Sequence, residues 1–190
     1  MFQVRFHGRG GQGVVTAAEL LSLAAFRDGK FAQAFPSFGS ERMGAPVVSF
    51  CRIDTKEIRL REPIVAPDCL VIQDVTLFRS VDVFQGLHAD AYLLVNSTRS
   101  IDELHIRPAV RRLPAGHTEI VPASELAAEH IGRPLPNAAL LGAFAALTGL
   151  VSLDRVAEAI QEVFPGEIGD ANVLAAQAAF DTVERSRVAA

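Results

Sequence analysis

The sequence predicts an α/β fold: a Rossmann-like open sheet, mixed but mostly parallel, with helices on both faces and a C-terminal helical appendage. Three observations predict it. Residues 2–6 alternate like a strand and lead through four glycines into residues 14–28, whose apolar side chains recur at helical spacing. The runs 69–74 and 91–97 are almost continuously apolar, as expected of parallel strands that are covered on both faces. Beyond residue 136 the pattern is that of closely spaced helices.

A length of 190 residues fits one domain. We expect a single α/β domain over residues 1–190, with a sheet-containing core in residues 1–135. The helices of residues 136–190 are expected to pack on that core as an appendage and not as a second active domain.

The first turn contains Gly8, Gly10, Gly11 and Gly13. Glycine permits positive φ and close approach to the backbone, and the N–H groups that open a helix attract negative charge. Such a turn can receive a phosphate, a carboxylate or a polar loop of another subunit. Its spacing also matches half of the dinucleotide fingerprint, but residues 30–36 lack the acid that should bind a ribose. A tight turn that only packs the helix on the sheet is the plainer interpretation.

Residues 31–35 should form the second strand. The loop that follows, residues 36–46, contains an aromatic residue, Phe38, and an adjacent acid–base pair, Glu41 and Arg42. Loops of this kind are often binding elements, although a solvated surface loop has the same composition.

Residues 46–53 should form a strand, and the next two residues should turn it back into a second strand over residues 56–60. Charged and apolar residues alternate in that second strand, which predicts a sheet edge or one wet face. Such a hairpin would make the sheet mixed.

Polar residues follow the buried strands. Asp74 closes the run that begins at Cys69, at the edge where open α/β sheets bind ligands, although capping a short helix from Thr76 explains it equally well. Asn96 ends the next strand on the same rim. A last strand is expected over residues 118–121.

The remaining helices are expected at residues 122–131, 138–150, 153–164 and 171–187. The second of these is apolar all round, which predicts a buried helix. Residues 166–169 should interrupt the helical structure after residue 164, and Asp170 should cap the last helix.

The net charge of −4 and the lack of a basic stripe argue against a nucleic-acid partner. The densest basic cluster, residues 107–112, fits a solvated helix face or an interface as well as an anion site. The sequence shows neither a secretory signal nor an apolar run long enough to span a membrane, so we expect a cytoplasmic protein without membrane contact.

Groups that could carry chemistry are scarce. Cys51 and Cys69 lie in strand-like runs and should be buried thiols. The sequence has no CxxC, no HExxH and no Cys/His cluster, so we expect no metal site and no iron–sulfur cluster on this chain. It also lacks a recognisable nucleophile–base arrangement, so no catalytic residue is expected. His7 is the one histidine beside the glycine turn.

Two stretches stand out together. They are residues 8–17, Gly-Arg-Gly-Gly-Gln-Gly-Val-Val-Thr-Ala, and residues 35–47, Phe-Pro-Ser-Phe-Gly-Ser-Glu-Arg-Met-Gly-Ala-Pro-Val. Together they resemble the two signatures of the gamma subunit of pyruvate (2-oxoacid):ferredoxin oxidoreductases. Further stretches are similar to the same family, up to about residue 180: residues 94–97, 136–137, 140–143 and 150–153. Many relatives have Pro-Glu-Arg-Arg where residues 40–43 are Ser-Glu-Arg-Met.

The resemblance implies an enzyme complex that oxidatively decarboxylates a 2-oxoacid such as pyruvate with coenzyme A, giving an acyl-CoA, CO2 and reduced ferredoxin. It implies thiamine diphosphate between partner alpha and beta subunits, and [4Fe-4S] clusters in the beta subunit and a ferredoxin-like delta subunit. This chain, inactive alone, would be an accessory domain that helps to close the active site and contributes to coenzyme A binding.

The expected binding rim gathers residues at the carboxyl ends of strands or at the turn beside them. The candidate cofactor-binding residues are Gly8, Arg9, Gly10, Gly11, Gln12, Gly13, Ser37, Phe38, Glu41, Arg42 and Asn96. We further expect Phe38 to anchor an interface with a partner subunit.

Two alternatives stay open: a stand-alone nucleotide- or coenzyme-A-binding module, and a purely structural subunit. The isolated chain could also form a homodimer. The sequence does not identify the 2-oxoacid, because its pocket would belong to other chains.

Overall fold

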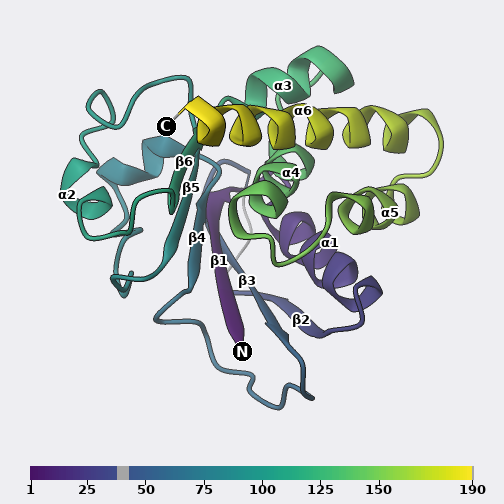
Figure 1. The fold of residues 1–190 in the computed structure, drawn as a ribbon, viewed down its shortest axis with the longest axis horizontal. Helices are drawn as coiled ribbons and strands as arrows, with labels where there is room; N and C mark the ends of the chain where they lie inside the picture. The colour runs from purple at the N-terminus through teal and green to yellow at the C-terminus, as the bar shows by residue number, and fades with distance from the viewer. Residues whose placement is uncertain (38–42, 190) are drawn as a thin grey trace.

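The computed structural model describes residues 1–37 and 43–189, and six strands within them form one sheet in the order β2-β3-β1-β4-β5-β6 (Figure 1). The strands are β1 (Phe2–Arg9), β2 (Phe31–Pro36), β3 (Pro46–Asp54), β4 (Cys69–Ile72), β5 (Tyr92–Asn96) and β6 (Thr118–Val121). Of these, β3 alone runs antiparallel to its neighbours, β1 and β2, whereas β1, β4, β5 and β6 pair in parallel. The predicted mixed and mostly parallel sheet is confirmed.

Helices cover both faces of the sheet, as predicted. Figure 1 shows five helices on one side and above: α1 (Val14–Arg27), α3 (Ala123–Ile131), α4 (Asn137–Thr148), α5 (Leu153–Val163) and α6 (Glu167–Ala189). The opposite face is covered by connecting loops and by two short helices, the 3₁₀ helix η1 (Val75–Arg79) and α2 (Arg107–Val110).

The alternation of side chains along each strand divides the core into two layers. On β1, Val4 and Phe6 join the cluster beneath the large helices, and Arg5 and His7 point to the opposite face. On β4, Leu70 and Ile72 belong to a separate cluster beneath η1 and α2. Cys51 and Cys69 are fully buried, as predicted, and burial raises the pKa of both thiols.

The helix α4 is buried along its whole length except for its last residue, which confirms the predicted buried helix. It packs closely on α6 at Gly142, where an added Cβ would lie 1.9 Å from the carbonyl oxygen of Ala176. The small side chain therefore sets the distance between the two helices.

The predicted hairpin over residues 46–60 is wrong. Residues 55–68 form an irregular segment, and the antiparallel partners of β3 are β1 and β2. Because β3 already has a strand on each side, it offers residues 56–60 no open edge. The Arg52 guanidinium holds the segment instead, by donating hydrogen bonds to the carbonyl oxygens of Leu60 and Glu62.

The predicted break is confirmed at Gly166, but the last helix begins at Glu167, so the break over residues 167–169 and the start at residue 171 are wrong. Asp170 lies in its first turn, and its N–H donates to the carbonyl of Gly166. Gly169 is helical, and a Cβ there would meet the Phe164 carbonyl oxygen at 1.8 Å. This glycine thus permits a close approach and does not end a helix.

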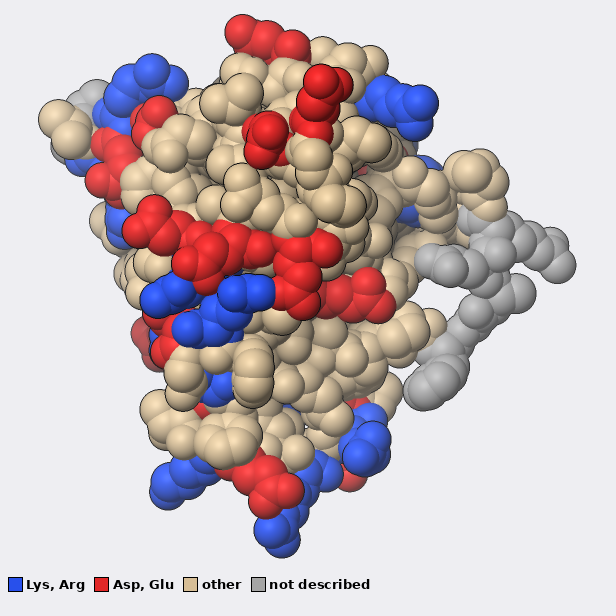
Figure 2. All heavy atoms as spheres, turned by 90° about the vertical axis from the view of Figure 1, so that its right-hand side faces the viewer, with Lys and Arg blue, Asp and Glu red and all other residues tan. Residues whose placement is uncertain are grey.

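Charged side chains form a band across the face where α1 and α5 lie (Figure 2). Arg27 of α1 pairs there with Glu158 and Glu162 of α5. In the part of the chain that the structure describes, no helix is both long enough and apolar enough to cross a bilayer.

The packing of α4 on α6 predicts the effect of Gly142→Ala. Alanine has the higher helix propensity by about 1 kcal/mol, so without the contact the change would stabilise the protein. We expect it instead to lower the free energy of unfolding by about 2 kcal/mol or more, because α6 must move away. Urea denaturation measures this change. Ala128→Gly on the exposed side of α3 gives the propensity effect alone, and a Gly142→Ala protein more stable than wild type would contradict the account.

Candidate functional site

The chain leaves the two central parallel strands in different directions. From β1 it passes through α1 to β2, and from β4 it passes through η1 to β5, on the opposite side of the sheet order. Ligands of open α/β sheets bind at the carboxyl ends of strands at such a switch point. Here this point lies between the glycine turn, residues 8–13, and the segment that follows β4, where Asp74 precedes η1.

A network of side chains closes the gap between the turn and β4. The Gln12 Oε1 accepts a hydrogen bond from the Arg9 N–H at 2.8 Å, and its Nε2 donates to Asp74 Oδ2 at 2.8 Å. The Arg9 guanidinium donates to Thr76 Oγ1 at 2.8 and 3.0 Å and lies 3.4 Å from Asp74 Oδ2. Asp74 also caps η1 by accepting from the Thr76 N–H at 2.9 Å, which confirms the predicted cap.

The turn needs glycine for two reasons. Gly11 and Gly13 have φ angles of 91° and 69°, the left-handed region that favours glycine. A Cβ on Gly11 would also lie 2.4 Å from the Met43 Sδ, and one on Gly13 would lie 2.6 Å from Nδ2 of Asn137, at the start of α4. The turn is therefore packed closely by this chain's own residues.

The two signature stretches meet at this turn. The Gly10 N–H donates to the Ala45 carbonyl at 2.9 Å, and the Gly44 N–H donates to the Gly10 carbonyl at 3.0 Å. Gly10 also forms an isolated bridge with Met43. Residues 43–45 thus lie along the glycine turn, although more than thirty positions separate the two stretches.

A polar hollow of about 300 Å³, which we call the rim hollow, opens over the ends of β4 and β5. Its walls include Gln12, Gln73, Asp74, Asn96, Arg99 and Ser124. Asn96 Nδ2 donates to the Gln73 carbonyl and to Ser124 Oγ, both at 2.8 Å, and its Oδ1 accepts from the Ser124 N–H at 3.0 Å. These bonds fix the amide of Asn96 and tie β5 to the start of α3.

Among the wall residues, Gln73 alone has a buried side chain without a hydrogen-bond partner within residues 1–37 and 43–189. It is only 1% exposed, and neither its Oε1 nor its Nε2 has a hydrogen-bond partner among those residues. Buried amides are normally paired, so this one marks a place where a polar partner would fit.

The charge of Asp74 is held in place by its neighbours. Burial by itself raises the pKa of this carboxyl. Hydrogen bonds from Thr76 and Gln12 and the nearby charge of Arg9 outweigh burial, and they hold the pKa below its usual value. Asp74 is therefore a carboxylate at neutral pH and is suited to accept hydrogen bonds.

The structure brings together some of the predicted site residues and separates others. Gln12 and Asn96 line the rim hollow, and the other residues of the turn from Gly8 to Gly13 lie beside it; that they bind a ligand stays a prediction. Ser37 instead lines a second cavity, with Arg5 and His7. Phe38, Glu41 and Arg42 lie outside the described residues. The sequence reasoning missed Gln73, Arg99 and Ser124; the position of Gln73 next to Asp74 at a strand end was the one available signal.

The rim hollow contains hydrogen-bond donors and acceptors, with the carboxylates of Asp74 and Glu125 among its lining side chains. Across the two described ranges, no three His, Cys, Asp or Glu side chains are grouped so that they could hold a metal ion. The arrangement can bind and orient a polar molecule.

The chain was compared with protein families and with curated proteins. Residues 3–182 match the family model for pyruvate ferredoxin/flavodoxin oxidoreductase. The chain is 46% identical to the pyruvate synthase subunit PorC of Methanothermobacter thermautotrophicus, over 99% of both chains. It is 48% identical to the common gamma subunit of pyruvate/ketoisovalerate oxidoreductases of Thermococcus kodakarensis, over 95% of this chain and 96% of that one.

Solved structures have the same fold. The pyruvate oxidoreductase subunit PORC of Thermotoga maritima superposes with a TM-score of 0.79 and 35% identity, over 95% of both chains. The 2-oxoglutarate:ferredoxin oxidoreductase of Magnetococcus marinus superposes with a TM-score of 0.71 over all of this chain and 31% of its own. At 19% identity, the second match shows the fold alone.

The Asp74 network predicts a pH-dependent loss of stability. Because the folded-state pKa is depressed, the carboxylate stabilises the protein above its unfolded pKa of about 3.9, and this contribution disappears as the pH falls through the folded pKa. Asp74→Asn should therefore lower the free energy of unfolding at pH 7 by about 1–3 kcal/mol. The difference from wild type should shrink below about pH 4. Chemical denaturation at several pH values measures it. Asp90→Asn, an exposed carboxylate, is the control, and a difference that does not change with pH would contradict this role.

His7 predicts a second pH effect. Burial first, and the charge of Arg5 second, lower the pKa of His7 to about 4. Between the unfolded pKa of about 6.5 and this value, the unfolded chain binds a proton that the folded chain does not. The free energy of unfolding therefore decreases as the pH is lowered through this range, by up to about 3 kcal/mol. His7→Gln should remove this slope. His130→Gln removes a histidine on α3 and should leave the slope unchanged. An equally steep slope in His7→Gln would show that other groups cause it.

Proposed function

The chain belongs to the pyruvate ferredoxin/flavodoxin oxidoreductase family as a gamma-type subunit, and from this premise we propose how it contributes to the enzyme. It acts as an accessory part of a complex that oxidatively decarboxylates a 2-oxoacid, such as pyruvate, with coenzyme A. The products are an acyl-CoA, CO2 and reduced ferredoxin. Its partners in this proposal are the alpha, beta and delta subunits.

The residues of this chain do not fit the redox groups of such an enzyme. Cys51 and Cys69 are its only cysteines, and both are fully buried in the sheet. Iron–sulfur clusters need several cysteine thiolates at one place. We therefore assign the clusters, and thiamine diphosphate, to the partner subunits. Thiamine diphosphate supplies the stabilised carbanion needed to remove CO2 from a 2-oxoacid.

The rim hollow carries the proposal. It is polar and preformed, and it contains the buried, unpaired amide of Gln73, but its residues have no arrangement for chemistry of their own. A surface of this kind can complete a pocket whose reacting groups lie on another chain. Ordering the substrate and excluding water are then the tasks of this subunit.

Coenzyme A is the component that we assign to the rim. It is long and polar, with phosphates at one end and amides along its arm. The exposed guanidinium of Arg99 offers a charge-assisted partner for a phosphate, and Gln73 carries a buried amide without a partner among the described residues. Arg9 is less available, because its guanidinium already binds Thr76 and the Gly44 carbonyl.

The sheet order weighs against a stand-alone dinucleotide module. In that motif the ribose-binding acid lies at the end of the strand next to β1. Here β3 separates β2 from β1, and β2 ends in Phe35 and Pro36. A purely structural subunit is the remaining alternative, and the experiment below separates it from coenzyme A binding.

The proposal predicts a selective kinetic defect in the assembled enzyme. Arg99→Ala should raise the KM for coenzyme A by about tenfold, because a charge-assisted contact is lost. The KM for the 2-oxoacid should stay within about twofold. Steady-state ferredoxin reduction by the reconstituted complex measures both constants.

Arg59→Ala is the matched control, since Arg59 is 83% exposed and pairs only with Glu57 among the described side chains. It should leave both constants unchanged. A complex that assembles normally with Arg99→Ala and keeps its KM for coenzyme A would leave only the structural role. If coenzyme A raised the melting temperature of the isolated chain, a stand-alone binding module would be favoured instead.

A further inference from the structure

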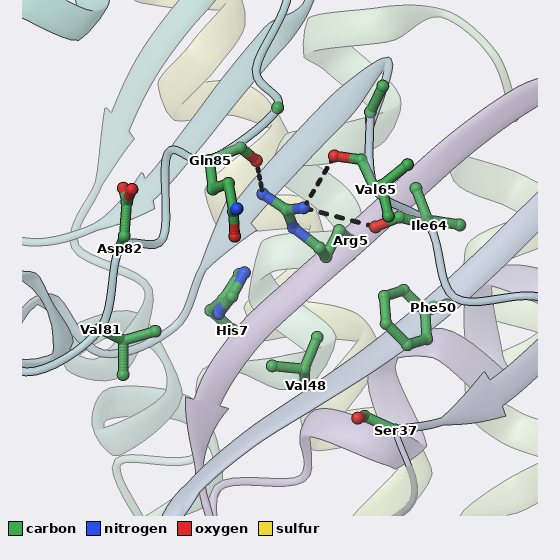
Figure 3. Close-up of a pocket in the computed structure, with 12 residues that line it drawn as sticks. Arg5, His7, Ser37, Val48, Phe50, Ile64, Val65, Val81, Asp82 and Gln85 are labelled. Atoms are coloured by element: carbon green, nitrogen blue, oxygen red, sulfur yellow. Dashed lines mark hydrogen bonds between the residues drawn. The ribbon is translucent and has the colours of Figure 1, made fainter.

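A second cavity, of about 550 Å³, lies on the sheet face opposite α1 (Figure 3). Its floor is formed by Arg5 and His7 of β1 and by Val48 and Phe50 of β3. Two loops that are far apart in the sequence form its walls, residues 64–66 and residues 81–86. It does not share a lining residue with the rim hollow.

One buried guanidinium holds both walls. Arg5 is 7% exposed, and it donates to the carbonyl oxygens of Ile64 and Val65 in one wall, both at 3.3 Å. It donates to those of Val83 and Gln85 in the other wall, at 3.0 and 2.6 Å. Figure 3 shows Arg5 between the two loops. The cavity is thus held in shape from within.

Gly86 brings the two walls into contact. Its φ angle is 76°, and an added Cβ would lie 1.8 Å from the Val65 carbonyl oxygen. Only glycine allows this approach. The walls therefore meet at a defined point, which makes this a built cavity and not an accidental gap between loops.

The lining is mostly apolar and carries little free charge. Val48, Phe50, Ile64 and Val81 are among the side chains that line it. The four carbonyl contacts occupy the outer nitrogens of Arg5, whereas its buried Nε has no partner among the described residues. The carboxylate of Asp82 stands at the wall as a counter-charge. The opposite charges of Arg5 and Asp82 offset each other, so this space offers neither an anion nor a cation an excess of opposite charge.

His7 provides the polar contact. It is 5% exposed, and its Nε2 has no hydrogen-bond partner among residues 1–37 and 43–189. Figure 3 shows its ring between Gln85 and Val48, in the floor of the cavity. Its depressed pKa keeps the imidazole neutral at pH 7, so it can exchange a hydrogen bond with an uncharged group.

We propose that this cavity is a binding site for a small, uncharged, mainly apolar molecule whose single hydrogen-bonding group is recognised by His7. Arg5 acts as a positioning residue that holds both walls in place. Pockets that bind small molecules combine apolar walls with a few fixed polar groups, and this cavity has that composition. The inference does not rest on the proposed role of the rim, because the single chain contains every residue that it uses.

Two probes of the same shape test the site on the full chain: cyclohexanecarboxamide, which is uncharged, and cyclohexanecarboxylate, which is an anion at pH 7.5. The imidazole signals of His7 in NMR spectra report binding. We expect the amide to shift them with a Kd on the order of 1 mM, and the carboxylate to bind at least about tenfold more weakly. No response of His7 up to about 20 mM amide, or equal affinity for the two probes, would overturn the proposal.

Ala66→Trp places a large side chain at an exposed lining position and should weaken amide binding by about tenfold or more. Ala115→Trp makes the same change in an exposed loop that does not line the cavity, and it should keep the affinity within about twofold. Thermal unfolding checks that both variants are folded. Unchanged amide affinity in Ala66→Trp would place the binding elsewhere and overturn the proposal.

Discussion

The hydrogen bonds of Gln12 hold the two halves of the sheet together where they diverge. One amide joins the backbone of Arg9, after β1, to the carboxylate of Asp74, after β4. The chain leaves these strands toward different sides, and the Gln12 bridge, together with the contacts of Arg9 to Thr76 and Asp74, joins the segments that follow them. The bridge makes one surface of them, and the rim hollow forms on that surface. A site held in this way is ready before a ligand arrives, which lowers the cost of binding.

The position of β3 explains most of the remaining architecture. Because it lies antiparallel between β1 and β2, residues 43–45 enter it from the rim and lie along the glycine turn. The same strand gives Val48 and Phe50 to the cavity on the opposite face. The strand β3 thus lines the second cavity, and the residues that lead into it pack against the glycine turn beside the rim hollow. In the role that we propose, the rim hollow binds and orients while the partner subunits carry out the chemistry.

Local patterns predicted most of the fold, because strand alternation, helical periodicity and capping are set by neighbouring residues. The cap at Asp74 is an example. Errors arose where long-range packing decided the outcome. Residues 56–60 alternate like a strand, but β3 already has a partner on each side. The sequence pattern predicts a helix break that includes Gly169, whereas this residue lies in the helix and lets the Phe164 carbonyl approach closely. The rim was predicted from strand ends. The buried contacts of Arg5 were not, since its carbonyl partners lie about sixty to eighty positions away.

Hydrogen exchange in the assembled enzyme tests the central claim most directly, namely that the rim of this chain completes a pocket shared with its partners. The measurement compares backbone exchange in the isolated chain with exchange in the complex. The account predicts that residues 8–13, 73–76 and 96–99 become protected on assembly, and further protected when coenzyme A is added. Exchange that is unchanged at all three segments in the complex would show that the rim faces solvent, and would contradict the account.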